Sequence, residues 1–108
     1  IYAPCDAQVM MLSDTLHAIG LKTNNGVEIM IHIGLDTVNL KGKGFSKIYT
    51  NESIVKGEPL ISFDQDIMNE NNVDLTTMLI VVNSKDHACN NLNLNNNVDL
   101  NDVVMCVD

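Results

Sequence analysis

The stretch EIMIHIGLDTV at residues 28–38 places one histidine inside an apolar, β-branched run and follows it with a glycine and an acid. Such a run favours a β-strand, in which successive side chains point to opposite faces. Glu28, Met30 and His32 then share one face, and the isoleucines at positions 29, 31 and 33 form the other. Because both faces carry apolar residues, we expect this strand to be covered on both sides. His32 points away from the isoleucine layer, so it is either buried and inert or held at the rim of a site.

The rest of the chain has the pattern of a β protein, since short apolar runs alternate with clusters of Gly, Asn and Asp. The sequence NNG at residues 24–26 separates two of these runs and predicts a hairpin turn, because Asn and Gly tolerate positive φ angles. Residues 64–70 are the best helix candidate, with Asp64 or Asp66 as the cap. The Asn-rich residues 90–97 are interpreted as a loop. We expect strands at residues 7–12, 17–23, 27–33, 45–48, 60–63, 79–82 and 103–107.

Length and composition fit one globular domain over residues 1–108, with 45% hydrophobic and 19% charged residues. No apolar run approaches the roughly 18 residues that a membrane-spanning helix needs. The net charge is −8, and none of the six basic residues is an arginine. This balance argues against a nucleic-acid partner, which requires a basic surface, and favours a protein partner with a basic rim.

The chain has three cysteines, Cys5, Cys89 and Cys106, which are far apart in the sequence. They are odd in number and none forms a CxxC pair, the spacing typical of zinc and redox sites. We expect reduced thiols in a cytosolic protein.

A second histidine, His17, begins the apolar run HAIGL, which is also a strand candidate. Two strands that each carry one histidine could bring both imidazoles to one face of a sheet. This arrangement suits phosphoryl transfer or metal binding. The third histidine, His87, follows Lys85 and Asp86 in a polar region and is expected at the surface.

Several blocks of sequence resemble the glucose-type IIA domain of the bacterial phosphoenolpyruvate-dependent sugar phosphotransferase system, and together they cover almost the whole chain. The most specific blocks are HAIGL at residues 17–21 and IHIGLDTV at residues 31–38, because both histidines keep their surroundings and spacing. The chain resembles an amino-terminally shortened member, since such domains usually carry further strands before the position that matches Ile1. The other matching blocks are Ala3-Pro4, NGVEI at 25–29, GKGF at 42–45, VKGEPLI at 55–61 and Phe63-Asp64.

The resemblance implies an all-β fold, an antiparallel β-sandwich of the barrel-sandwich hybrid type with short helical turns. It also implies a cytoplasmic phosphotransferase component that works through a phosphohistidine intermediate. Members of the family accept a phosphoryl group from the carrier protein HPr on one histidine. They pass it to a cysteine of the IIB domain of a sugar permease, through which alone they meet the membrane. No cofactor is implied.

The resemblance also assigns roles to individual residues. The phosphoacceptor matches His32, the supporting histidine matches His17, and the threonine that orients it matches Thr15. Asp36 matches an acidic residue at the rim of the site, although the residues alone favour a helix or turn cap at that position.

The proposed chemistry explains why these residue types are needed. A neutral imidazole is a good nucleophile near pH 7, provided that its other nitrogen is held by a hydrogen bond to a backbone carbonyl. Gly34 would allow the backbone to approach His32 closely enough to supply that carbonyl. Met30 and Val38 would form an apolar rim that docks partners and excludes water.

Two alternatives remain open from the sequence. A non-catalytic, regulatory IIA-like binding module would keep the fold without the relay. Zinc could bind His17 and His32, with a third ligand from Asp36 or from a partner carboxylate. A zinc peptidase is disfavoured, because the His-x-His and His-x₃-Asp spacings of related sandwich folds are absent.

Overall fold

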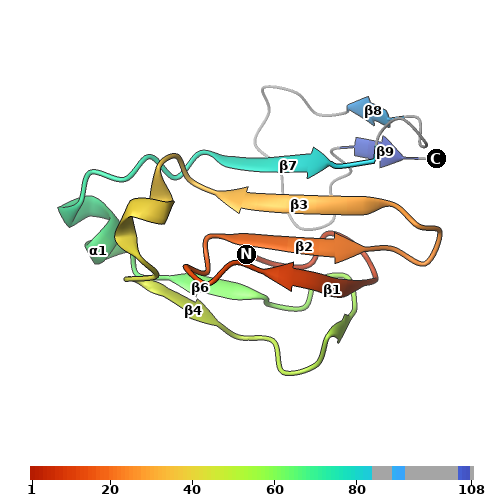
Figure 1. Ribbon diagram of the computed structural model, residues 1–108, viewed down its shortest axis with the longest axis horizontal. Coiled ribbons are helices and arrows are strands. Elements are labelled where there is room, and N and C mark those ends of the chain that lie inside the picture. The colour runs from red at the N-terminus through yellow and green to blue at the C-terminus, as the bar shows by residue number, and fades with distance from the viewer. Residues whose placement is uncertain (84–88, 92–104, 108) are drawn as a thin grey trace.

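A computed structural model of the chain describes residues 1–83, 89–91 and 105–107. Its largest element is a five-stranded antiparallel sheet in the order β5-β1-β2-β3-β7. Strands β1, β2, β3 and β7 run side by side across this sheet (Figure 1). Its strands are β1 Ala7–Leu12, β2 Ala18–Lys22, β3 Glu28–Ile33, β5 Ser53–Ile54 and β7 Thr77–Val81.

A smaller layer faces the large sheet and makes the fold a sandwich. It is the antiparallel pair of β4 (Phe45–Lys47) and β6 (Ile61–Phe63), which lies against one side of the large sheet in Figure 1. The short helices η1 (Thr37–Leu40) and α1 (Gln65–Glu70) lie together at the end of the sandwich where β3 finishes (Figure 1). The expected all-β sandwich with short helical turns is therefore confirmed.

The core lies between the two layers and is filled by the isoleucine face of the sheet. Ile33 is fully buried, and Ile29 and Ile31 are nearly so, as the period-2 pattern of β3 predicts. Burying this apolar area is the main favourable term in folding. The other fully buried side chains of the core are Ile19, Leu21, Leu60, Ile61 and Met68.

The opposite face of β3 differs from our expectation. Glu28, Met30 and His32 are half-buried, and no described element covers them. Ile80, which pairs with Met30 across the sheet, is 43% exposed. Among the described residues, the cover expected on this side of β3 is therefore not seen, and this uncovered face carries a histidine.

The turn and the helix cap agree with the sequence prediction. Gly26 has φ 87°, and the turn is closed by hydrogen bonds from Gly26 N to Thr23 O and from Thr23 N to Val27 O. Asp64 caps α1 by accepting from the backbone N–H groups of Asp66 and Ile67. Between the two candidates, the cap is thus Asp64.

Strand bounds were predicted well in the amino-terminal half. β1 matches its prediction at both ends, and β2, β3, β4 and β6 fall inside the predicted ranges. β7 begins two residues before the predicted range 79–82, and the two-residue β5 was not predicted.

The carboxy-terminal pair of strands differs from the sequence prediction. Residues 90 and 91, predicted as loop, belong to strand β8 (Cys89–Asn91), which pairs with β9 (Met105–Val107). The loop interpretation was wrong for these two residues. Asn has a low preference for β-strands, but backbone pairing with β9 stabilises the strand here. The rest of that predicted loop and His87 lie outside the described residues.

Within the described part of the chain, no helix is long and apolar enough to cross a membrane.

Candidate functional site

The two histidines meet at the end of the β2–β3 hairpin. Ala18 pairs with His32 across the two strands, and His17 stands directly before Ala18. The backbone N–H of Ile33 donates to the carbonyl of His17 at 2.7 Å. The imidazole centroids are 4.9 Å apart and the rings stand at 79°, in an edge-to-face arrangement. The expected meeting of both imidazoles is therefore observed.

The ring of His32 is fixed by the backbone two residues further on. Its Nδ1 lies 2.9 Å from the carbonyl oxygen of Gly34, at the distance of a good hydrogen bond. Because a carbonyl can only accept, Nδ1 carries the proton in this contact. Neutral His32 then has its lone pair on Nε2, as a nucleophile requires.

Gly34 is the residue that makes this contact sterically feasible. Its φ is +76°, and a Cβ there would lie 2.8 Å from the carbonyl oxygen of Asp74. The same carbonyl accepts the N–H of Leu35 at 2.8 Å. The backbone after β3 therefore packs closely against the segment before β7. We expected such a close backbone approach at Gly34.

Two hydroxyl groups converge on one nitrogen of His17. Thr15 Oγ1 lies 2.5 Å and Ser13 Oγ lies 3.4 Å from His17 Nδ1. Ser13 Oγ also accepts the backbone N–H of Ala18 at 3.2 Å. Thr15 therefore stands where the resemblance places it, whereas the sequence reasoning did not single out Ser13.

The electrostatic setting keeps His17 neutral near pH 7. Burial is the main cause that lowers the pKa of His17 below its ordinary value, and the neighbouring His32 lowers it further. A hydrogen bond involving the Thr15 backbone acts in the opposite direction on this pKa. His17 is only 8% exposed, so burial removes hydration from its charged form.

Thr37 is a structural residue of the site that sequence reasoning missed. It is fully buried, and its hydroxyl donates to the carbonyl of Ile33 at 2.6 Å. The one hint in the sequence is its position, four residues after the end of the buried strand β3. By holding that carbonyl, Thr37 fixes the backbone at the point where Gly34 turns back toward His32.

Asp36 does not cap helix η1 with its side chain. It occupies the N-cap position with φ 56°, but its carboxylate accepts no backbone N–H there. A cap needs an extended backbone at this position, and the left-handed conformation turns the side chain away. The expectation of a capping role was therefore wrong, and Asp36 is exposed.

Apolar residues share the uncovered sheet face with His32. Met30 pairs with Gly20 on one side and Ile80 on the other. Met11 lies next to Gly20, since a Cβ on Gly20 would be in ordinary van der Waals contact with the sulfur of Met11, at 3.8 Å. Val38, the other expected rim residue, is 52% exposed on η1. We call Met11, Met30 and Ile80 the apolar row.

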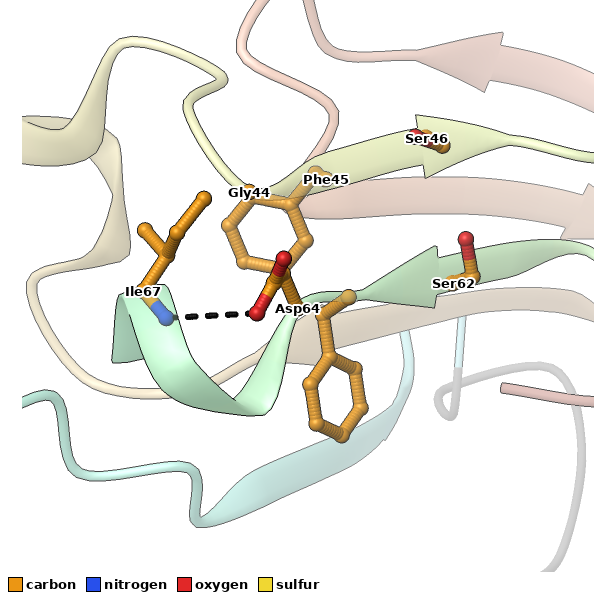
Figure 2. Close-up of a pocket in the computed structure, with 7 residues that line it drawn as sticks. Gly44, Phe45, Ser46, Ser62, Asp64 and Ile67 are labelled. Carbon is orange, nitrogen blue, oxygen red and sulfur yellow. Dashed lines mark hydrogen bonds between the residues drawn. The ribbon is translucent and has the colours of Figure 1, made fainter. Parts of the chain in front are cut away.

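A separate open hollow of about 440 Å³ lies between β4, β6 and the start of α1. Figure 2 shows Asp64 at its edge with the carboxylate turned toward the N–H of Ile67. That carboxylate already accepts two backbone N–H groups, and Ser46 and Ser62 are exposed on the strands. The hollow therefore offers fewer converging polar groups than the histidine pair.

The described residues do not bring a third metal ligand to the histidine pair. Within residues 1–83, no three His, Cys, Asp or Glu side chains gather closely enough to hold an ion. Asp36 therefore does not complete a three-ligand set with His17 and His32. A zinc site there would need a ligand from outside the described residues.

Comparison with known proteins places the chain in a family. The model of the family described as phosphoenolpyruvate-dependent sugar phosphotransferase system, EIIA 1, matches residues 1–87. A glucose-specific EIIA component from Staphylococcus epidermidis is 41% identical over 85 residues, which is 78% of this chain and 51% of that protein. A mannose-specific EIIBCA component from Corynebacterium glutamicum is 39% identical over 85 residues, or 78% of this chain and 12% of that protein.

A solved structure supports the same assignment. The glucose permease IIA from Mycoplasma capricolum superposes with a TM-score of 0.65 at 32% identity, over 75% of this chain and 53% of that chain. The chain thus spans about half the length of the separate EIIA components that it matches. Because the family model covers most of its length, this chain belongs to the EIIA 1 family of the phosphoenolpyruvate-dependent sugar phosphotransferase system.

Proposed function

We propose that this chain is a histidine phosphocarrier of the sugar phosphotransferase system, with His32 as the phosphoacceptor. It takes a phosphoryl group from HPr and passes it to a cysteine of a IIB domain, in the cytoplasm. The observation that carries this proposal is the 2.9 Å contact between His32 Nδ1 and the Gly34 carbonyl, which leaves Nε2 free to attack phosphorus.

The chemistry is a pair of in-line displacements. His32 Nε2 attacks the phosphorus of phosphorylated HPr, so that one N–P bond forms while the donor's N–P bond breaks. In the second step a cysteine thiolate of the IIB domain attacks, and an S–P bond replaces the N–P bond at His32. Such loose transition states need positioning and charge stabilisation more than covalent help from the protein.

His17 supplies the charge stabilisation in this proposal. A neutral imidazole holds one proton, which sits on Nε2 when the Thr15 hydroxyl donates to Nδ1. That N–H can then donate to the phosphoryl oxygens as negative charge develops on them. The lowered pKa of His17 supports the neutral form that this arrangement requires.

The apolar row, together with Val38, would form the docking surface for both partners. These side chains are exposed or half-buried although they are apolar, and Met30 lies on the same face of β3 as His32. Covering them on docking would exclude the water that could hydrolyse the phosphohistidine. Relatives that carry EIIA fused to EIIB and EIIC in one chain support the IIB domain as one partner.

The test is phosphorylation in a purified system. The chain is incubated with labelled phosphoenolpyruvate, enzyme I and HPr, and acid-labile phosphate is counted on the wild type, His32→Ala and His17→Ala. We expect label on the wild type and none on His32→Ala. His17→Ala should take up label more slowly and pass it on poorly to a IIB domain.

The same experiment separates the relay from a binding-only module. A wild-type chain that binds HPr but takes no label would overturn the relay in favour of a regulatory module. Equal labelling of the wild type and His32→Ala would overturn the assignment of the phosphoacceptor.

A further inference from the structure

We propose that Ser13 is a second positioning residue for His17, acting together with Thr15 at the same ring nitrogen. The inference rests on the proposed function, in which His17 donates from Nε2. It concerns which group holds the proton of His17 in place, and not which residue is phosphorylated.

The hydrogen-bond capacity of the Ser13 hydroxyl carries the argument. A hydroxyl has one hydrogen and two lone pairs, and the N–H of Ala18 takes one lone pair at 3.2 Å. Among the described residues, the only other polar partner of this oxygen is His17 Nδ1 at 3.4 Å. In the arrangement that we propose, the hydrogen of Ser13 is directed at Nδ1, which accepts it while Nε2 carries the proton.

The backbone fixes the Ser13 side chain instead of leaving it free to rotate. The N–H of Ser13 donates to the carbonyl of Ala18 at 3.0 Å, while its hydroxyl accepts from the N–H of Ala18. Its carbonyl accepts the N–H of Leu16 at 2.9 Å, and Leu16 has the left-handed φ of 61°. Ser13 thus closes the turn that presents both Thr15 and His17.

The two hydroxyls at Nδ1 together favour the Nε2–H tautomer more strongly than either does alone. Thr15 is closer, at 2.5 Å, and should contribute more than Ser13. Ser13 links the tautomer to the start of β2, because the same oxygen contacts both the ring and the Ala18 backbone. Shifting the turn would therefore release both contacts together.

The deciding experiment is long-range ¹⁵N–¹H NMR of the histidine-labelled chain, which reports the tautomer of each imidazole. Three variants are compared with the wild type. Ser13→Thr keeps the hydroxyl, Ser13→Ala removes it, and Ser13→Asp keeps an acceptor for Ala18 N–H but has no hydrogen to donate at pH 7.

We expect the Nε2–H tautomer of His17 in the wild type and in Ser13→Thr. Ser13→Ala should show a mixture of tautomers, and Ser13→Asp should move the proton to Nδ1 and raise the pKa of His17. A wild-type His17 with its proton on Nδ1 would overturn the proposal. So would an unchanged tautomer in Ser13→Asp, since Ser13 would then only close the turn.

Phosphoryl transfer provides a second readout. Ser13→Ala should slow transfer from HPr by about two- to tenfold, the range expected for one net hydrogen bond, while Ser13→Thr stays near the wild type. If Ser13→Ala does not fold, Ser13→Thr and Ser13→Asp still decide the question by NMR. A wild type that takes no label would overturn the proposed function, whereas the tautomer result stands independently of it.

Discussion

Thr37 lies against Gly34 so closely that a Cβ on Gly34 would be 2.5 Å from the Thr37 methyl carbon. Real Cβ atoms do not approach other atoms to this distance, so the glycine and the buried threonine fit only as a pair. The carbonyl of Gly34 in turn accepts from His32 Nδ1. The packing behind β3 therefore sets the orientation of the proposed nucleophile.

Replacing Gly34 with alanine should damage both stability and the site. We expect a loss of about 2–4 kcal/mol in the free energy of unfolding, from the left-handed φ and from overpacking together. Urea unfolding of Gly34→Ala measures this loss. Gly26→Ala is the matched control, because Gly26 has φ 87° but no atom within 4 Å of an added Cβ.

The control isolates the steric effect. Gly26→Ala should lose only the conformational part, about 1–2 kcal/mol. Equal losses in the two variants would show that the contact with Thr37 carries no cost. In that case His32 would also keep its hydrogen bond to Gly34.

Removing the hydroxyl of Thr37 tests the other half of this pair. Thr37→Val keeps the shape of the side chain but deprives the Ile33 carbonyl of a buried hydrogen bond of 2.6 Å. We expect a loss of about 1–2 kcal/mol in stability, measured by thermal or urea unfolding. Thr37→Ser restores the hydroxyl and should recover more of the wild-type tautomer of His32 than Thr37→Val does. A Thr37→Val protein as stable as the wild type would contradict this role.

Stability should depend on pH through His17. Burial and His32 hold its pKa below the ordinary value near 6.5, and unfolding restores that value. Between the two values the unfolded chain binds more protons, so the stabilisation is complete above about pH 6.5 and declines as the pH falls, by at most about 1.4 kcal/mol per pH unit.

His17→Gln removes this titration and provides the comparison. Urea unfolding at several pH values between 8 and 5 should give a shallower fall in stability for His17→Gln than for the wild type. Parallel curves would mean that folding does not perturb the pKa of His17.

A lysine in the apolar row should weaken partner docking without unfolding the chain. Ile80 is 43% exposed and pairs with Met30, so Ile80→Lys places a charge in the proposed docking surface. We expect a rise in the KM for HPr with little change in unfolding free energy. Val55→Lys is the control, because Val55 is 60% exposed and directly follows β5, at the opposite edge of the sheet from β7. Equal effects of the two lysines on KM would place the docking surface elsewhere.

The sequence predicted the parts of the fold whose signal is local and periodic. The strand around His32 follows from alternating side chains, and the turn at Gly26 follows from residues that accept positive φ. The two-residue β5 has too few residues to show a period, and its pairing with Ala7 depends on contacts distant in sequence. Local patterns therefore could not reveal it.

The candidate site was predictable to a similar extent. The meeting of His17 and His32 followed from two neighbouring strands and from the family resemblance. The capping role expected for Asp36 was wrong because a backbone φ of 56° cannot be read from an aspartate in a sequence. Ser13 and Thr37 were missed because their partners are a ring nitrogen and a carbonyl that only the folded chain brings near them.

The hairpin of β2 and β3 makes the site depend on a turn at its far end. Ala18 opposes His32 only because the ladder from Lys22 and Glu28 keeps its register over the whole length of both strands. Removing one residue from the turn at Gly26 would shift that ladder by one step, which would turn His32 toward the core and the isoleucines of β3 toward the outer face. The site therefore depends on the length of this loop as well as on its composition, although no loop atom takes part in the proposed chemistry.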